Sequence, residues 1–391
     1  MPLTAFEIGL ISVFSFCFII QLLFYWIVLA KPYYYMKHID NKDLQISSSS
    51  PPVSIVLLME NSNYDLFRFL PDIFEQEYPE FEVIIVTDGI SMEDENELIR
   101  FKNRYSNLYT THVPEDTKNI SRKKLALSLG IKAAKYDKIL FTETDCRIRS
   151  KNWIFLMTRH FSDKKSIVLG FSAIENTNNL SQKFIALDYF FSNLQMISLA
   201  LFNRPYTGNG RNMAYSKEHF IEQKGFIKYR SLQQGADDLF INEIATKENT
   251  SVELSPESVT LSEVNDLHEW KQQKLDRTTT ERFYKRGPVA FWRLETFFRI
   301  GFFVAFISCL ICGFPYKSLS NFLLPGIALF CFLVRLSSQI YIINKTVEYL
   351  QLEKFYFTII LIDIFQPFIN LYFYIYRALK EKENYIYFYE K

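Results

Sequence analysis

Acidic side chains follow two apolar segments that read as buried strands. Asp88 lies at the end of the string IIVTD, and Glu143 and Asp145 follow the string KILFT. A carboxylate at the end of a strand can accept hydrogen bonds from a base or a ribose, and two carboxylates spaced two residues apart can approach one hard divalent cation that bridges phosphates. Each signal is weak by itself, because Asp-Gly after a strand is also an ordinary turn and an acidic loop is often simply solvated.

Basic residues lie between these acidic positions along the chain. Lys123 and Lys124 open a helix-like segment, 122–135, that precedes the strand-like string KILFT. Lysines next to a strand edge that binds phosphates would meet the phosphate charge. Solvent exposure is the other reading, and the sequence leaves both open.

The pattern around these residues predicts an α/β domain. Continuous apolar segments at 53–58, 81–87 and 138–142 read as buried strands, and helix-like segments at 64–75 and 122–135 alternate with them. Such strands are typical of a mostly parallel sheet covered on both faces, which binds ligands at the carboxyl ends of its strands.

Apolar segments near both ends predict membrane helices. Residues 8–30 form a run of 23 residues without a charge, long enough to cross a bilayer core of ~30 Å. Lys31 and Lys37 follow this run, so we expect the chain to enter the cytosol there. Three further spans are expected at 300–316, at 318–334 and beyond Arg335, and at 355–376, where Asp363 is the only charge. A carboxylate inside a membrane span needs a reason to be there: it either pairs with a residue on another helix or lines a path for a substrate.

The segment between the domain and these spans is basic and aromatic. Residues 267–299 carry eight Lys or Arg against four acids, with Trp270 and Trp292 among them, which favours an amphipathic segment on an anionic membrane face over a solvated helix.

Four full spans would place both termini outside, yet Arg377, Lys380 and Lys382 favour a cytosolic tail. Either one C-terminal segment is re-entrant or interfacial, or the bias of the tail is overridden. The expected divisions are 1–31, 52–265, 266–299, 300–376 and 377–391, with a Ser/Pro linker at 47–52.

Composition excludes several classes of protein. A net charge of +1 gives no support for binding nucleic acid. Five cysteines, four of them in apolar stretches, do not form the framework of a small secreted domain, and the five histidines do not cluster at the spacing of metal ligands.

Seven motifs in order give the chain a resemblance to a known family. They are VSIVLLMEN at 53–61, EVIIVTDG at 82–89, RKKLALSLGIKAAK at 122–135, ILFTETDC at 139–146, GNGRNMAYSKEHF at 208–220, GADDLFIN at 235–242 and QQKLDR at 272–277. This order, over residues 52–285, resembles membrane-bound members of the inverting family 2 glycosyltransferases, which have a GT-A fold.

The resemblance implies roles for individual residues. The nucleotide would be bound by Asp88, Lys123 and Glu143, and a divalent metal, Mg²⁺ or Mn²⁺, by Asp145 with Glu143. Asn209 and Gly210 would lie near the acceptor and the donor sugar, Asp237 and Asp238 would supply the catalytic base, and Arg277 would meet the diphosphate.

The same resemblance implies a function and a location. It implies a multi-pass membrane enzyme of polysaccharide biosynthesis that moves a sugar from a nucleotide-sugar, with a UDP-sugar expected, to a lipid-linked or glycan acceptor. Its catalytic domain would face the cytosol, with the inner membrane of a bacterium as the expected site.

The chain departs from the family pattern at three places. Glu143 stands where the family has the first Asp of a D-x-D element, Ala236 stands where the base could fall, and Asp276 stands where an Arg is usual. Arg277 is displaced by one residue, which on a helix is a rotation of about 100°. These departures motivate an alternative, a degenerate homologue that binds nucleotide sugar or assists glycan assembly without turnover. A transporter component with a regulatory domain is a more distant possibility.

Overall fold

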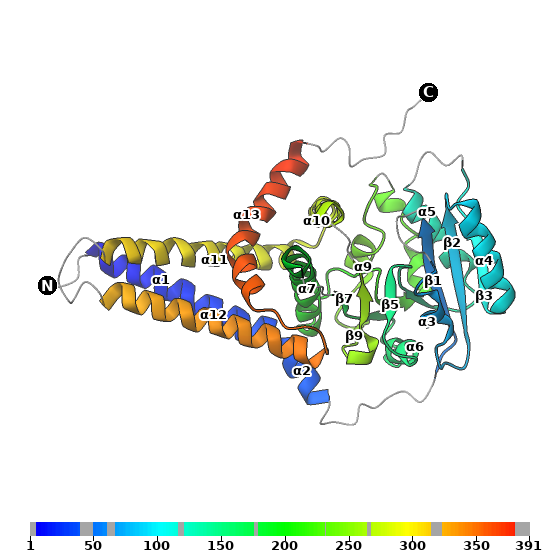
Figure 1. Cartoon of the computed structure of the whole chain (residues 1–391), viewed down its shortest axis with the longest axis horizontal. Coiled ribbons are helices and arrows are strands. Elements are labelled where there is room, and N and C mark those ends of the chain that lie inside the picture. The colour runs from blue at the N-terminus through cyan, green and yellow to red at the C-terminus, as the bar shows by residue number, and fades with distance from the viewer. Residues whose placement is uncertain are drawn as a thin grey trace.

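The computed structural model of the chain describes residues 5–39, 50–60, 67–115, 121–175, 179–230, 232–263, 267–313 and 323–379. Long helices form a bundle at one end of the molecule, and an α/β domain forms the other end (Figure 1).

The apolar strands predicted from the sequence lie side by side in the larger sheet of this domain. Within the described residues this sheet has seven strands in the order β3-β2-β1-β4-β8-β6-β9, and β8 runs antiparallel to both of its neighbours while the others share one direction. The predicted α/β class with a mostly parallel sheet is confirmed. The strands are β1 (Val53–Glu60), β2 (Phe81–Asp88), β3 (Leu108–His112), β4 (Lys138–Phe141), β6 (Ile167–Leu169), β8 (Met213–Ser216) and β9 (Thr250–Val252).

A second, smaller sheet adjoins the first. It has the order β5-β10-β7, and its strands are β5 (Cys146–Ile148), β7 (Ser172–Ile174) and β10 (Thr260–Ser262). Strand β5 begins directly after Asp145, so the acidic loop 142–145 joins the two sheets.

Helices cover both faces of the larger sheet because successive side chains of each strand point to opposite faces. Val56 of β1 belongs to the apolar core shared with α5, α7 and α9, whereas its neighbours Ile55 and Leu57 pack with α3, α4 and α6. The helices of the domain are α3 (Leu70–Phe74), α4 (Met92–Arg104), α5 (Arg122–Ala133), α6 (Trp153–Thr158), α7 (Leu180–Leu201), α8 (Lys217–Glu222) and α9 (Asp238–Ile244), with short 3₁₀ turns at Ile227–Tyr229 and Pro256–Ser258.

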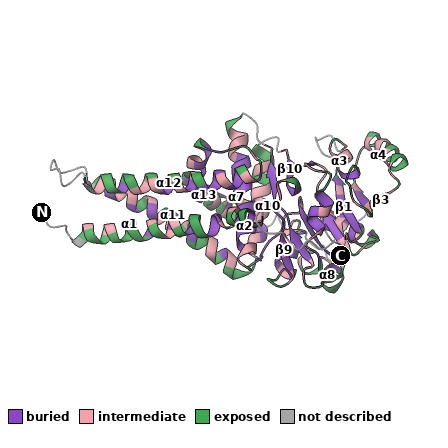
Figure 2. Cartoon of the chain, turned by 90° about the horizontal axis from the view of Figure 1, so that it is seen from below, coloured by how far each residue is buried: buried purple, intermediate pink, exposed green. Residues whose placement is uncertain are grey.

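Three long helices form the bundle. Helix α1 (Ala5–Leu23) continues through a π-helical stretch (Phe24–Leu29) into α2 (Lys31–Ile39), and it packs against α11 (Arg286–Gly313) and α12 (Leu323–Tyr349). Much of the outer surface of the bundle is exposed, as Figure 2 shows. Apolar side chains occupy this exposed surface, which suits contact with lipid; they include Ile8, Phe16, Val304, Ile311, Phe330 and Leu333.

A buried polar cluster ties the bundle to α13 (Phe357–Leu379). Arg335 of α12 is fully buried, and its Nη2 donates to Asp363 Oδ1 at 2.8 Å and to Gln21 Oε1 at 3.0 Å. Arg299 of α11 donates to Gln366 Oε1 of α13 at 2.9 Å. Asp363 therefore has the helix partner that its position requires, rather than lining an open path.

Helix α13 does not run along the bundle axis. In Figure 1 it runs at a steep angle to α11 and α12, on the side of the bundle that faces the α/β domain. There it contacts α7 and α10 (Leu267–Glu281).

Several boundaries differ from those expected. By length and composition, five helices of the described residues could cross a membrane, and the fifth is α7, which is mostly buried against β7 and β9 inside the domain. Helix α11 already begins at Arg286, so the boundary expected at 299/300 falls inside a helix. The helix expected at 64–75 is the short α3, and residues 64–66 of that stretch lie outside the described residues. Residues 47–49 of the linker and 380–391 of the tail lie outside them as well.

Candidate active site

A cavity of about 340 Å³ opens between the carboxyl edge of the larger sheet and the helices α7 and α10. Its walls are strongly charged, as a site for a charged ligand requires. The charged residues that line it are Lys123, Glu143, Asp188, Arg211, Asp237, Asp238, Lys274, Asp276 and Arg277.

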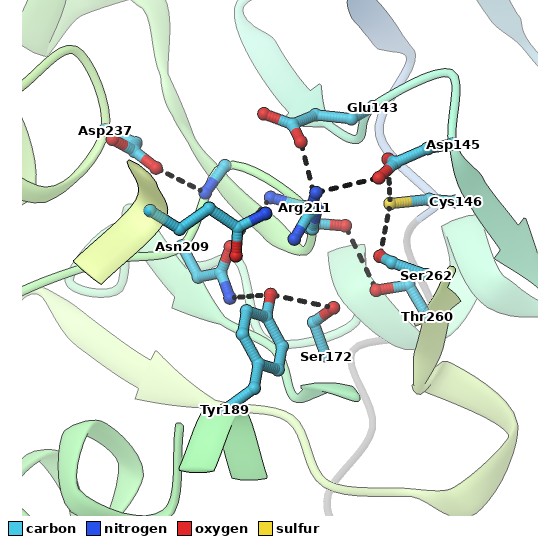
Figure 3. Close-up of polar contacts among 12 residues, drawn as sticks. Glu143, Asp145, Cys146, Ser172, Tyr189, Asn209, Arg211, Asp237, Thr260 and Ser262 are labelled. Carbon is cyan, nitrogen blue, oxygen red and sulfur yellow. Dashed lines mark hydrogen bonds and ion pairs between the residues drawn. The ribbon is translucent and has the colours of Figure 1, made fainter. Parts of the chain in front are cut away.

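Glu143 and Asp145 are joined by an arginine. Arg211 Nε donates to Glu143 Oε2 at 2.9 Å, and Arg211 Nη2 donates to Asp145 Oδ2 at 2.7 Å (Figure 3). Lys123 Nζ bonds the other oxygen of Glu143 at 2.9 Å. Burial alone would raise the pKa of Glu143, but Lys123 and Arg211 lower it to about 2. Glu143 lines the cavity, whereas Asp145 lies behind Arg211 and does not.

As they stand, these carboxylates do not fit a metal site. Each gives one oxygen to Arg211, and the second oxygens are bonded to Lys123 Nζ and, at 3.3 Å, to Cys146 Sγ. Within the part of the chain that the structure describes, no group of three His, Cys, Asp or Glu side chains gathers as a metal site would require. A divalent cation could take these oxygens only if Arg211 left them.

Asp237 and Asp238 both line the cavity but are bound differently. Asp237 Oδ2 accepts a hydrogen bond from the backbone N–H of Gly210 at 3.0 Å. Asp238 accepts hydrogen bonds from the Thr280 hydroxyl, from Tyr284 Oη at 2.6 Å and from the backbone N–H of Leu239 at 2.7 Å. Burial and the neighbouring Asp237 raise the pKa of Asp238. Asp237 is the less engaged carboxylate of the two.

Backbone geometry fixes where the acidic motif points. Gly235 has φ +97°, a region that side chains disfavour, and a Cβ there would lie 2.5 Å from Leu239 Cδ1. Ala236, which follows, is buried in the core and does not line the cavity. The alanine therefore takes a core position and leaves the cavity to the two aspartates.

The two lysines of α5 have different surroundings. Lys123 faces the cavity, whereas Lys124 is fully buried. Lys124 Nζ donates to the backbone oxygens of Tyr229 at 2.7 Å, Leu232 at 2.8 Å and Gln234 at 2.6 Å. It faces neither the cavity nor solvent, and instead anchors the segment that leads into the acidic motif.

Asp88 lies at the same sheet edge but outside the cavity lining. It ends β2 opposite Glu60 of β1, and Arg122 Nε donates to both of its carboxylate oxygens at 2.9 Å. Strand β1 lies between β2 and β4, so Asp88 and the loop that carries Glu143 and Asp145 share the carboxyl edge of one sheet.

Asn209 and Gly210 lie in the segment before β8. Asn209 lines the cavity, and its Nδ2 donates to Tyr189 Oη at 2.7 Å and to Asn193 Oδ1 at 3.0 Å. A Cβ on Gly210 would lie 3.2 Å from Asp237 Oδ2, so the backbone approaches this carboxylate closely.

Asp276 and Arg277 of α10 both line the cavity, although they are adjacent on a helix. Gln272 Nε2 donates to Asp276 Oδ1 at 3.0 Å, and burial raises the pKa of Asp276 to about 6. The displacement of Arg277 by one residue therefore does not remove it from the site.

Comparison with known proteins identifies the class of enzyme. The family model described as glycosyl transferase family 21 matches residues 20–382. The chain belongs to glycosyl transferase family 21. The predicted class of enzyme is confirmed, and the matching family is family 21, whereas the resemblance in the sequence pointed to family 2. No curated protein sequence matches the chain.

Solved structures resemble this family 21 glycosyltransferase in fold. The mannosyltransferase PcManGT from Pyrobaculum calidifontis, solved with GDP-Man and Mn²⁺, is 15% identical with a TM-score of 0.54, over 90% of this chain and 99% of that chain. S. aureus TarS is 16% identical with a TM-score of 0.37, over 58% of this chain and 39% of that chain. At 15% identity PcManGT is similar to this chain in fold alone, and the likeness to TarS is weaker still.

The site of this glycosyltransferase includes residues that sequence reasoning missed. Arg211 lies in the motif GNGRNMAYSKEHF at 208–220, but no binding role was predicted for it. Asp188 of α7 bonds Trp270 Nε1 at 2.9 Å and Lys274 Nζ at 2.8 Å, which joins α7 to α10 across the cavity. A signal was present, because Asp188 and Lys183 are the only charges in the apolar stretch 180–201.

Proposed function

We propose that this family 21 member transfers a sugar from a nucleotide-sugar to an acceptor held at the membrane face, with inversion at the anomeric carbon. The observation that carries the proposal is one cavity that holds both Asp237, a carboxylate able to take a proton, and Lys123 and Arg211, cations able to meet a diphosphate. A UDP-sugar is the proposed donor. Because PcManGT was solved with GDP-Man, GDP-sugars belong in the same tests.

Asp237 is the proposed base because it is the less engaged carboxylate. The acceptor hydroxyl gives its proton to Asp237 as its oxygen forms a bond to the anomeric carbon. The bond from that carbon to the diphosphate oxygen breaks, and the electron pair leaves with the nucleoside diphosphate. Lys123 Nζ donates to Glu143 Oε1 at 2.9 Å, and Lys123 lines the cavity. There it stabilises the charge that develops on the leaving group. Asp88, held by Arg122, is proposed to contact the nucleotide from the adjoining sheet edge.

Whether the predicted Mg²⁺ or Mn²⁺ takes part in the reaction is tested by experiment. Glu143 and Asp145 are the residues that would hold it, and a bound metal would supply charge to the leaving diphosphate. Because both carboxylates are occupied by Arg211, no step is assigned to a metal.

We also propose a topology with three spans. Helices α1, α11 and α12 would cross the bilayer, and α13, which lies across their ends, would lie at the cytosolic face (Figure 1). At 28 and 27 residues, α11 and α12 are longer than the ~20 residues a bilayer core needs. Three spans place the α/β domain and the basic C-terminal tail on the same side, which resolves the conflict between four spans and the charge of the tail.

The acceptor is proposed to arrive from the membrane. The cavity is lined by α7 and α10, and both helices contact α13. A lipid-linked sugar or glycan at the membrane face would therefore lie next to α7 and α10, the helices that line the cavity.

The test is a donor and acceptor screen with the whole protein. Detergent-purified chain is incubated with UDP- and GDP-sugars and membrane lipid extract, with Mn²⁺ and with EDTA, and the products are identified by mass spectrometry. A glycosylated product that disappears with Asp237→Asn supports the proposal. Binding of nucleotide-sugar without any product would favour the degenerate alternative, and absence of binding to any nucleotide-sugar would end the proposal.

A further inference from the structure

Arg211 occupies the space between the two carboxylates that were predicted to hold a metal (Figure 3). Glu143 and Asp145 each give it one oxygen, at 2.9 and 2.7 Å. We propose that Arg211 is the built-in cation of this site and supplies, at the diphosphate of the donor, the positive charge that a divalent metal was predicted to supply. This inference rests on the proposed function.

Arg211 is held in place through both its backbone and its side chain. The backbone N–H of Arg211 donates to Asn209 Oδ1 at 3.1 Å, and its backbone oxygen accepts from Thr260 Oγ1 at 3.1 Å. Its guanidinium carbon lies 5.7 Å from the centre of the Tyr189 ring. Arg211 is only 8% exposed. A cation fixed in this way needs no reorganisation when charge develops on a ligand, which is the condition for strong electrostatic stabilisation.

The two carboxylates beside Arg211 already have cations as partners. The carboxylates of Glu143 and Asp145 are balanced by Lys123 and Arg211, with both Glu143 oxygens bonded to cations. A divalent ion placed between the same carboxylates would meet two positive charges at short range and would have to displace at least Arg211.

Arginine has the geometry for the task. Two of the three guanidinium nitrogens of Arg211 bind carboxylates, and the residue lines the cavity. Nη1 is left to donate to a phosphate oxygen, in the planar arrangement that suits phosphate. When the bond to the anomeric carbon breaks, the electron pair stays on the diphosphate oxygen, and Arg211 and Lys123 stabilise its charge.

The experiment uses the full chain in detergent, stripped of metal with EDTA. The affinity for UDP and GDP is measured by calorimetry with and without Mn²⁺, and Mn²⁺ binding without nucleotide is measured by electron paramagnetic resonance. For the wild type we expect affinities within about threefold of each other in the two conditions. We also expect no stoichiometric Mn²⁺ binding at the site.

Variants of Arg211 should reverse this behaviour. Arg211→Ala frees Glu143 and Asp145, so it should gain Mn²⁺ binding and lose about tenfold or more in nucleotide affinity in EDTA. Mn²⁺ should restore much of that affinity. Arg211→Lys keeps a charge and should fall between the two. The matched control is Arg159→Ala, which removes another Arg–Glu pair, with the buried Glu253 at 2.8 Å, and should change stability but not Mn²⁺ binding.

The wild-type measurements alone can overturn the inference, even if Arg211→Ala does not fold. Nucleotide binding that strictly requires Mn²⁺ would show that the metal, and not Arg211, is the cation, and the proposed function would stand. A wild type that binds no nucleotide in either condition would instead count against the proposed function.

Discussion

The backbone N–H of Gly210 donates a hydrogen bond of 3.0 Å to Asp237 Oδ2, which joins two motifs that lie 27 residues apart. This bond leaves the other oxygen of Asp237 for an acceptor hydroxyl. Its neighbour Asp238 is bonded to Tyr284, Thr280 and the Leu239 backbone, so the two carboxylates should differ in their effects.

Asp237→Asn should lower kcat by ~10²–10⁴-fold with little change in nucleotide affinity, because it removes the proposed base. Asp238→Asn should instead lower the free energy of unfolding by about 1–3 kcal/mol, because buried donors lose a charged acceptor. Steady-state kinetics, calorimetry and thermal unfolding separate the two effects. Asp163→Asn, at an exposed position, is the control. Equal loss of kcat in Asp237→Asn and Asp163→Asn would contradict the assignment.

Nucleotide affinity should depend on pH through Asp276. Burial raises the pKa of Asp276 to about 6, with hydrogen bonds from Gln272 and Gln234 and the charge of Lys123 lowering it and Asp238 raising it. Below pH 6 the group is neutral, and above pH 6 it is an anion that repels a diphosphate. Asp276→Asn should therefore bind UDP about three- to tenfold more tightly than the wild type at pH 7.5, and about equally at pH 5. A difference that does not vary with pH would rule this out.

Lys124→Met should destabilise the domain. The variant leaves three backbone carbonyl oxygens, one buried and two partly buried, without their donor, which at about 1 kcal/mol each lowers the free energy of unfolding by up to roughly 3 kcal/mol. Because these carbonyls precede Gly235, turnover should fall as well. Thermal unfolding followed by tryptophan fluorescence measures the first effect, and Lys132→Met, exposed on the same helix, should change neither.

The Arg335–Asp363 pair should be costly to break from one side. Asp363→Leu leaves the fully buried Arg335 uncompensated, so a loss of about 3–5 kcal/mol is expected. The double variant Arg335→Met/Asp363→Leu should regain most of that loss. Thermal stability of the detergent-extracted wild type, Asp363→Leu, Arg335→Met and the double variant gives the coupling energy. Additive losses in the double variant would show that the two residues do not stabilise each other.

The proposed topology with three spans predicts on which side of the membrane a fused reporter will lie. A reporter fused after the C-terminal tail should be cytosolic, and one inserted between α11 and α12 should be outside. Fluorescent and periplasmic-enzyme reporters test both positions. An external C-terminus would mean that α13 crosses the bilayer as a fourth span.

The sequence predicted the sheet well because apolar strands and their alternation with helices depend on local composition. The three strands expected at 53–58, 81–87 and 138–142 are β1, β2 and β4. The orientation of α13 was not predictable, because it depends on the pairing of Asp363 with Arg335, a residue on another helix.

The acids of the site, together with Lys123 and Arg277, were predictable from the sequence, but the position of Arg211 was not. Carboxylates after strands are visible as short motifs, whereas the position of Arg211 depends on how β8 brings residues 209–213 against the loop after β4. Lys124 was ambiguous for the same reason, because the carbonyl groups that bind it lie more than 100 residues away.

The placement of α13 between the bundle and α7 has a consequence for the choice of substrate. If α13 lies at the membrane face as proposed, its packing on both would hold the cavity at one depth relative to the bilayer. Under the proposed function, the protein would then select acceptors by how far their reactive hydroxyl projects from the lipid. Synthetic acceptors that differ only in the length of the spacer between lipid anchor and sugar should show one optimum, set by this helix.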